Sequence, residues 1–228
     1  MADYLVFTLI APMGSFGGLA GHEQRGSHHF PGRSAILGLL GAAFGIRRHD
    51  RQGQEALRVW KTAVGAFEVG EAWQDFHTVQ TVPSARIKRP TTRKDAIAAL
   101  HRSDNGLITR RSYHSDCVFK VALWGGDLDA ACAALRQPFF VPYLGRKSCP
   151  LSAPMAPKIV TMADPVEALK QAVVPDFIGL STQEIHFIAS DEPIGPDRTE
   201  TRWDDPLDRE DWHFGQRQVY IHVPGDAP

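Results

Sequence analysis

One apolar stretch dominates the pattern of the chain, between residues 30 and 48 (FPGRSAILGLLGAAFGIRR). No charged or polar side chain occurs from Ala35 to Ile46, so the pattern predicts a helix that is buried on all sides. Bulky residues recur at every fourth position on one face, and small residues gather at helical spacing on another. We expect a strand backbone to approach this second face closely, because it carries Gly38, Gly41, Ala42 and Gly45.

Shorter apolar runs predict the strands and helices around this helix. Residues 4–10 (YLVFTLI) are rich in aromatic and β-branched side chains and should form a central first strand. Further strands are expected within residues 57–69, at 75–78 and at Cys117–Trp124 (CVFKVALW). Asp127 should open a helix through Leu135. If residues 139–143 add a strand, the first part resembles the split β-α-β arrangement called ferredoxin-like, and the fold class is α+β.

The hydrophobic periodicity breaks down between Thr81 and Ser115. This stretch is too polar to build a core and long for a loop, so it predicts a projecting hairpin or arm. Disorder is the alternative for the same residues. An ordered arm could lie along a phosphate backbone or along the acidic face of a partner protein.

A smaller, β-rich C-terminal unit is expected over residues 151–228, after a first domain over residues 1–150. Its pattern predicts a helix at 164–172 and strands at 184–190 and 217–223. An acidic segment with prolines and two tryptophans, Trp203 and Trp212, lies between them. We expect this segment to be solvated irregular chain, with a loop that faces a partner as the alternative.

Charge limits how such a chain could bind nucleic acid. A formal net charge of −1 and a pI near 6.8 exclude binding through bulk positive charge. Two local segments nevertheless have opposite signs. Residues 86–111 hold eight Lys or Arg against two acids, and residues 191–211 hold nine acids against three arginines. The basic segment coincides with the predicted arm, so any nucleic-acid binding must be local.

Cysteine usage and the apolar runs indicate a soluble, cytoplasmic protein. Cys117, Cys132 and Cys149 are odd in number and form no CxxC pair, which argues against a disulfide framework and a zinc knuckle. Asp3 near the N-terminus, with no cationic region before the apolar residues, does not fit a signal peptide. The apolar helix is about a dozen residues long, too short to cross a bilayer.

Histidines offer a weak signal for chemistry. His22, His28 and His29 lie in a glycine-rich loop after the first strand. The adjacent pair, His28 and His29, suggests a metal site, but no third ligand has workable spacing. Asp75 and His77 should point to the same face of a strand. They could form an acid–base pair, although a polar cluster that holds a strand end is the simpler reading. We expect neither a metal nor another cofactor.

The loop between Pro142 and Pro150 has a composition suited to ligand contact. Gly145 lets backbone approach closely, Arg146 and Lys147 supply charge, and Tyr143 offers a ring for stacking a base. Ser148 adds a hydroxyl group. The loop lacks the glycine spacing and following helix of a Walker loop, so phosphate transfer from a mononucleotide is not indicated. Further candidates are at the two ends of the apolar helix: Arg33 and Ser34, where unpaired N–H groups attract anions, and Arg47 and Arg48.

Taken together, these stretches resemble the CasD family, the type I-E members of the CRISPR-associated RAMP proteins. The resemblance rests on an ordered set of motifs that spans nearly the whole chain. These are YLVFTLIAPMGSFG at 4–17, FPGRSAILGLLGAAFGIRR at 30–48, DFHTVQ at 75–80, CVFKVALW at 117–124, PYLGRKSCPLSAP at 142–154 and DEP at 191–193. The arm matches only in its charge, and the histidine-bearing loop has no motif to align.

The resemblance implies a RAMP-type, ferredoxin-like (RRM-like) body with a basic thumb. It further implies a noncatalytic Cascade subunit that caps the 5′ handle of CRISPR RNA (crRNA) and contacts the backbone subunit next to the thumb and the large subunit. Target DNA would be met through the assembled complex, with no membrane partner. Our candidates for RNA contact are Arg33, Ser34, Arg47, Arg48, Tyr143, Gly145, Arg146, Lys147 and Ser148, with Arg86, Lys88, Arg89, Arg110 and Arg111 in the arm.

Two other functions stay open at this point. A metal-independent endoribonuclease that processes CRISPR precursor RNA would need a base for the 2′-OH and a cation near the scissile phosphate. Tyr113 with His114, or His77 with Lys120, supply the residue types. The other alternative is a pure assembly protein whose basic arm meets only protein.

Overall fold

The computed structural model describes residues 1–18, 21, 23–67, 70–80, 91–101, 106–179, 185–195 and 198–224 of the 228-residue chain. Its strands are β1 (Ala2–Gly14), β2 (Gln24–Arg25), β3 (Lys61–Ala66), β4 (Ala72–Val79), β5 (Leu107–Trp124), β6 (Lys158–Met162), β7 (Phe187–Ser190), β8 (Arg198–Asp208) and β9 (His213–His222). Its helices are α1 (Arg33–Phe44), α2 (Arg51–Ala56), α3 (Arg93–Ala98), α4 (Leu128–Arg136) and α5 (Pro165–Lys170), with single 3₁₀ turns at Leu57–Val59 and Asp176–Ile178. The fold is therefore mixed helix and strand.

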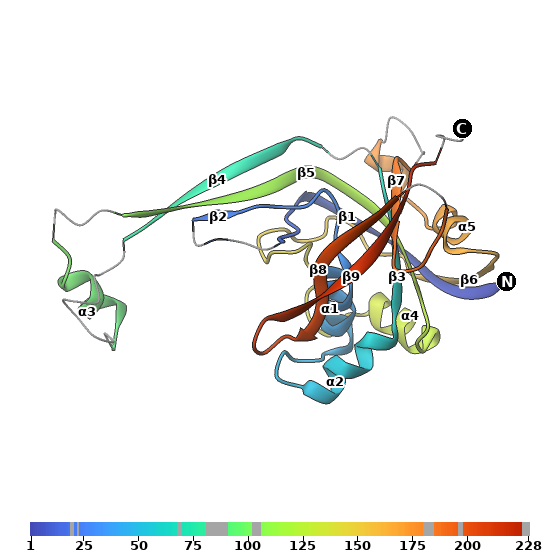
Figure 1. Cartoon of the computed structure of the whole chain (residues 1–228), viewed down its shortest axis with the longest axis horizontal. Helices are drawn as coiled ribbons and strands as arrows, with labels where there is room; N and C mark the ends of the chain where they lie inside the picture. The colour runs from blue at the N-terminus through green and yellow to red at the C-terminus, as the bar shows by residue number, and fades with distance from the viewer. Residues whose placement is uncertain are drawn as a thin grey trace.

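A single, mostly antiparallel sheet organises the described residues (Figure 1). Its strand order is β6-β1-β5-β3-β7-β9-β8, and β2 and β4 pair with β5 outside this path. Among the strand pairings of the described residues, only the short β2–β5 pairing is parallel. The central pair is β1 and β5, with Leu9 directly opposite Phe119. The strands predicted at 4–10 and 117–124 are confirmed, and both are longer than their apolar cores suggested.

Helices cover both faces of the central strands. On one face, Phe7 and Leu9 of β1 share a buried cluster with Leu37 and Leu40 of α1 and Leu135 of α4. On the other face, alternate residues of β1 and β5 pack against Leu169 of α5. Helix α4 begins where predicted, because the Asp127 carboxylate accepts a hydrogen bond from the Ala130 N–H at 3.0 Å.

The small-residue face of α1 lies against side chains, so our expectation of a strand backbone there is wrong. A Cβ atom at Gly38 would lie 3.3 Å from Nη1 of Arg209, and one at Gly41 would lie 2.9 Å from a methyl group of Leu57. The opposite, bulky face of α1 packs on the sheet instead. The small face is thus left to line a cleft, described below.

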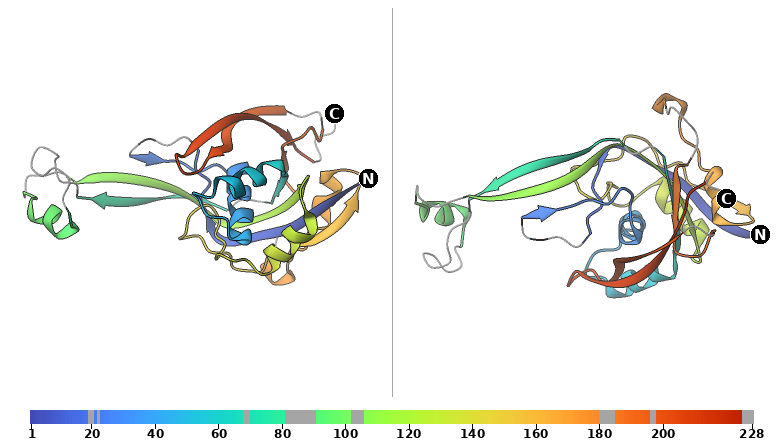
Figure 2. Two further views of the ribbon diagram at one scale, coloured as in Figure 1. Left: turned by 90° about the horizontal axis from the view of Figure 1, so that it is seen from below. Right: turned by 45° about the horizontal axis from the view of Figure 1, so that its top comes forward.

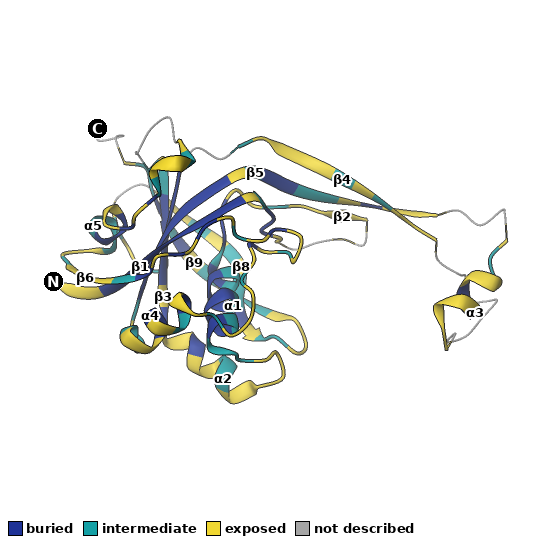
Figure 3. Cartoon of the chain, turned by 180° about the vertical axis from the view of Figure 1, so that it is seen from behind, coloured by how far each residue is buried: buried dark blue, intermediate teal, exposed yellow. Residues whose placement is uncertain are grey.

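An extended hairpin of β4 and β5 leaves the body of the molecule, with α3 near its far end (Figures 1 and 2). The ladder runs from Ala72 opposite His114 to Val79 opposite Leu107. The arm therefore begins at Ala72, nine residues before the predicted start at Thr81, because alternating polar and apolar residues still pair as strands. Figure 3 shows much of β4 as exposed on this arm.

The strands after residue 150 extend the same sheet at both edges. Strand β6 pairs with β1, and β7 pairs with β3 and carries the β8–β9 hairpin. The division of the chain at residue 150 stays a prediction. The helix predicted at 164–172 and the strands predicted at 184–190 and 217–223 are present as α5, β7 and β9.

Two local predictions are wrong. Residues 139–143 form no strand, because the N–H groups of Phe139 and Phe140 donate to the carbonyl groups of Ala43 and Ala42 at the C-terminus of α1. The acidic segment is not irregular chain, because most of it forms β8, which pairs with β9. Across the part of the chain that the structure describes, no helix is long and apolar enough to span a bilayer.

Candidate nucleic-acid interface

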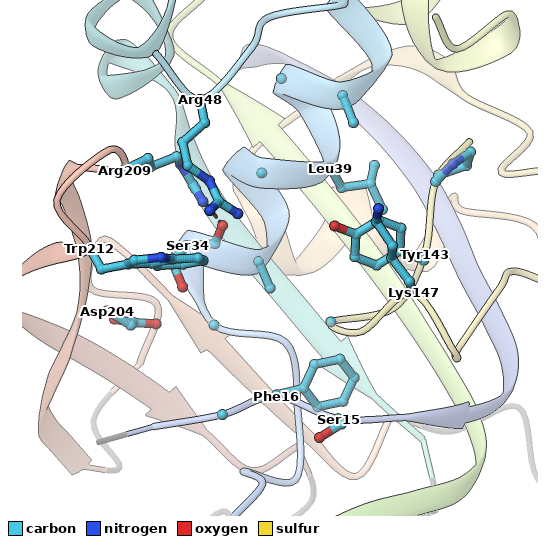
Figure 4. A pocket seen from close by; sticks show the side chains of 18 of the residues that line it. Ser15, Phe16, Ser34, Leu39, Arg48, Tyr143, Lys147, Asp204, Arg209 and Trp212 are labelled. Atoms are coloured by element: carbon cyan, nitrogen blue, oxygen red, sulfur yellow. Dashed lines mark hydrogen bonds between the residues drawn. The ribbon is translucent and has the colours of Figure 1, made fainter. Parts of the chain in front are cut away.

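A cleft of about 1260 Å³ lies over the small-residue face of α1. The loop after β1, the loop at 140–150 and the β8–β9 hairpin complete its walls. In Figure 4, Arg48, Arg209 and Trp212 lie on one side of α1, with Tyr143 and Lys147 on the other and Phe16 at one end. The cleft therefore combines aromatic rings with cations on both sides of a helix whose small residues leave room between them.

Two arginines meet on the β8–β9 side of the cleft. The Arg209 guanidinium donates a hydrogen bond of 2.6 Å to the carbonyl oxygen of Ser34, and the Arg48 guanidinium lies 4.3 Å from the centroid of the Trp212 ring. Burial, and then the neighbouring charge of Arg48, lower the pKa of Arg209 from its usual value. Since arginine stays charged at physiological pH, the two cations make this wall attractive to an anion.

The opposite wall is a tight loop fixed against β1. Leu144 N–H donates to the Cys149 carbonyl at 2.7 Å, and Ser15 N–H donates to the Leu144 carbonyl at 3.2 Å. Gly145 has φ of +85°, and a Cβ atom there would clash with the carbonyl oxygen of Ser15. Glycine is therefore required at this position for two separate reasons. The loop holds Tyr143, which is 39% exposed, and Lys147 at the cleft.

The N-terminus of α1 is already occupied by an acid of the protein. Gly32 is the N-cap residue and has no capping side chain, but Asp204 of β8 accepts a hydrogen bond of 2.9 Å from the Arg33 N–H. The Arg217 guanidinium holds the same carboxylate from the other side, with Nε 2.5 Å from Oδ1. The acidic segment thus supplies the anion that we expected from a ligand.

Arg33 is buried in protein contacts. Its guanidinium donates to Asp191 at 2.6 Å, to Asp205 at 3.1 Å, and to the carbonyl oxygens of Trp60 at 2.5 Å and Arg58 at 2.9 Å. Only 9% of the side chain is exposed. These contacts use four of the five N–H donors, so Arg33 ties α1 to β8 and to the start of β3.

The cleft brings together five of the predicted contact residues and leaves the others elsewhere. Those that line it are Ser34, Arg48, Tyr143, Gly145 and Lys147. Arg47 is exposed beyond the end of α1, and Ser148 is exposed in the 142–150 loop. Arg110 and Arg111 lie on β5 in the arm. Arg86, Lys88 and Arg89 fall outside the described residues.

Several cleft residues were missed as contact residues from the sequence, and three of them, Arg25, Arg209 and Trp212, have side chains suited to RNA. Arg209 and Trp212 come from the segment expected to be irregular, and Arg25 comes from the loop for which we had no motif. The available signal was an arginine and a tryptophan placed three residues apart among acids. The acids around them hid it, although three acids of the same segment, Asp191, Asp204 and Asp205, pair with Arg33 or Arg217 in the fold.

A second group of aromatic and basic residues lies where the arm meets the body. Trp73 of β4 stacks on Tyr113 of β5, with ring centroids 4.7 Å apart and planes at 16°. The guanidinium of Arg146, a predicted contact residue, lies over the same Tyr113 ring at 4.9 Å. Arg146 therefore belongs to the base of the arm although its loop neighbours line the cleft.

Neither residue pair considered for catalysis has suitable geometry. His77 pairs with Thr109 of β5, and Lys120 is eleven residues further along that strand, which separates the two by roughly 37 Å. Tyr113 and His114 are consecutive in a strand, so they point to opposite faces. His114 is 3% exposed, and burial followed by the charge of His29 lowers its pKa.

Asp75 and His77 lie on the same face of β4, as predicted, and their Oδ2 and Nε2 atoms are 2.5 Å apart. They lie on the arm, away from the cleft. Among the residues that the structure describes, no group of three or more His, Cys, Asp or Glu could hold a metal ion. The chemistry supported by the geometry is binding of an anionic, partly aromatic ligand.

Comparison with known proteins identifies the class. The profile of the CRISPR-associated protein Cas5 family, in its Cas5d form, matches residues 4–220, so the chain belongs to this family. Among curated relatives, the CRISPR system Cascade subunit CasD of Escherichia coli strain K12 is 30% identical over 204 residues, which cover 85% of this chain and 90% of the relative. The resemblance inferred from the motifs is confirmed.

Solved structures agree with this assignment. A chain of a CRISPR RNA-guided surveillance complex superposes with a TM-score of 0.72 and 26% identity, over 97% of this chain and 90% of that one. A crystal structure of a Cas protein gives a TM-score of 0.63 and 24% identity, over 96% and 94% of the two chains, which supports the fold alone.

Proposed function

We propose that this chain is a noncatalytic subunit of a type I-E Cascade surveillance complex that binds and caps the 5′ handle of crRNA in antiviral defence. Membership of the Cas5 family and similarity to a Cascade CasD subunit support the complex. The observation that carries RNA binding is the cleft over α1, where Arg48 and Arg209 face Lys147 and Tyr143.

The chemistry of this cleft suits a single strand of RNA. Phosphate groups need cations and N–H donors, while unpaired bases need aromatic rings and room. Arg48, Arg209 and Lys147 supply the charges, and Tyr143 is a ring that a base could stack on. The bases would enter between Arg209, which lies over Gly38, and Tyr143, where Ala35 and Ala42 line the cleft.

We further infer that the body is a ferredoxin-like RAMP domain and that the β4–β5 arm is its thumb. The four strands β6-β1-β5-β3 are adjacent and antiparallel, and α1 and α4 follow β1 and β5 in the chain. This is the order expected of a split β-α-β arrangement. On this reading the thumb contacts the neighbouring backbone subunit, another face meets the large subunit, and target DNA is reached through the assembled complex.

Salt-dependent binding tests the proposal. End-labelled CRISPR repeat RNA from the same genome is titrated with the full chain in EDTA, at several salt concentrations, and analysed on native and denaturing gels. Each phosphate contact on a single strand contributes roughly 0.7 to the slope of log affinity against log salt. We therefore expect Arg48→Ala with Lys147→Ala to lower the slope by roughly 1.4, with the RNA intact. Lys170→Ala, on the distant helix α5, is the control and should leave the slope unchanged.

Two results contradict the proposal. Scission of the RNA at one site, abolished by His77→Ala or His114→Ala, identifies a processing endoribonuclease. A wild-type chain that does not bind RNA in any salt, yet assembles with the other Cascade subunits, identifies a pure assembly protein.

A further inference from the structure

The base of the arm holds a stack of three side chains. Trp73 and Tyr113 are directly opposite each other in the β4–β5 ladder, and their rings are nearly parallel with centroids 4.7 Å apart. Arg146, from the 142–150 loop, lies over the Tyr113 ring at 4.9 Å. Three separate segments of the chain therefore meet in one stack.

The stack is buried at its centre and exposed at one end. Tyr113 is only 5% exposed, whereas Trp73 is 42% exposed. The ladder and the Tyr113 ring together restrict the indole, so stacking another flat group on it costs little conformational entropy. Trp73 is therefore better prepared to stack on a ligand than an exposed tryptophan whose ring is free to rotate.

Two arginines near the stack, Arg111 and Arg146, have hydrogen-bonding capacity to spare. The Nε atom of Arg111 and the Nη1 atom of Arg146 are both buried and have no hydrogen-bond partner among the described residues. Such donors are rarely left unpaired, so each points to an acceptor that binds there. Asp75, on the same face of β4 as Trp73, already pairs through its carboxylate with His77.

The stack is continuous with the cleft. Arg25 lines the cleft and pairs in register with Arg111 of β5, while Lys147 lines the cleft one residue after Arg146. A strand of RNA in the cleft could thus pass Arg25 and Arg146 and reach Trp73. A ligand with flat groups and regularly spaced anions matches both places.

We propose that Trp73 stacks one unpaired base of the bound RNA where the strand leaves the cleft, with Arg111 and Arg146 donating to the phosphates beside that base. This inference rests on the proposed function, since it names a further contact of the same RNA. Stacking is sequence-tolerant because every base has a π-face. Trp73 therefore fixes the path of the strand at the base of the arm and does not select the base.

A cycle of protein and RNA changes tests the stack. Trp73→Ala should weaken binding of the labelled repeat RNA to the full chain by roughly 5- to 150-fold, and Trp73→Phe, which retains a ring, by much less. The RNA is then made as a series with one abasic nucleotide at each handle position. If Trp73 stacks on one base, removing that base should abolish the difference in affinity between wild type and Trp73→Ala, because the stacking contact is then absent in both complexes. Removing any other base should leave the difference in place. Trp203→Ala removes another exposed tryptophan and should change nothing.

The outcomes separate this inference from the function on which it rests. Salt-sensitive binding by the wild type with unchanged affinity of Trp73→Ala overturns the stack and leaves the cleft proposal standing. The inference is also overturned if Trp73→Ala lowers the affinity for every abasic RNA by the same factor, since Trp73 then only supports the fold. Loss of assembly with a neighbouring subunit, at unchanged RNA affinity, assigns Trp73 to a protein contact instead. A wild type that binds no RNA overturns both proposals.

Discussion

Arginines serve two purposes in this chain, and Arg33 serves the structural one. Its position before the apolar helix suggested a phosphate contact, yet its guanidinium meets two carboxylates and two carbonyl oxygens of the protein. Asp191, the partner at 2.6 Å, also binds Arg217 at 2.6 Å and accepts from the Thr62 N–H at 2.8 Å. Partners within the protein thus decide the role, because Arg33 makes four hydrogen bonds to the protein whereas Arg209 at the cleft makes one, to Ser34.

Replacing Arg33 by methionine should destabilise the fold. The change leaves Asp191 and Asp205 without one of their cations in a site where only 6% of the Asp191 side chain is exposed. Breaking a buried pair in this way costs about 3–5 kcal/mol of the free energy of unfolding. Urea denaturation followed by circular dichroism measures the difference.

A matched surface variant provides the control for Arg33. Lys170 pairs with Glu167 at 2.6 Å, but 58% of its side chain is exposed, so Lys170→Met should change the free energy of unfolding by less than about 1 kcal/mol. If Arg33→Met were as stable as wild type and lost RNA affinity, Arg33 would be a ligand contact after all. The buried cluster would then have no structural role.

At the scale of elements, the sequence correctly predicted the helices and strands whose signal lies within their own residues. The apolar runs of β1, β5 and α1 and the Asp127 cap of α4 were sufficient, because each signal is local. The strand β8 was missed because Asp204 and Asp205 look solvated in the sequence, whereas in the fold they pair with Arg217 of β9 and with Arg33, which is distant in sequence. The cleft was only half predicted for the same reason, since Arg209 and Trp212 reach it from the β8–β9 hairpin.

The arm is an element that the body should not need. Val79 and Leu107 are paired at the end of its ladder, so an Asn-Gly turn can replace residues 80–106 and close the hairpin there. Within α3, Ala96 is the only residue that is buried, and the main core clusters contain no residue of that helix. We expect the shortened chain to keep its thermal midpoint within about 2 °C by calorimetry.

Shortening the arm should affect assembly with the other Cascade subunits. If the arm contacts the backbone subunit as proposed, the shortened chain should bind repeat RNA through the cleft and fail to join the other Cascade subunits on size-exclusion chromatography. A shortened chain that still assembles would remove the arm from that interface. One that no longer folds would mean that the arm supports the body.

For the whole molecule, the question is whether residues 1–150 and 151–228 fold separately. Strand β6 pairs with β1 from Ala2 opposite Met162 to Val6 opposite Lys158, and β7 pairs with β3. Both edges of the strands from the first 150 residues are thus covered by strands from the last 78. The ion cluster of Arg33 and Asp191 joins the same two parts.

We therefore expect a fragment of residues 1–150 to lack a cooperative folded state. Without the later residues, β1 and β3 present unpaired edges, and the apolar side chains that pack on Leu169 of α5 face water. The fragment should show no sharp thermal transition by circular dichroism and should aggregate. Co-expression with residues 151–228 should restore one transition, because the missing strands complete the sheet. A sharp transition of the fragment alone would instead establish an independent first domain, with the boundary near residue 150 that the composition suggested.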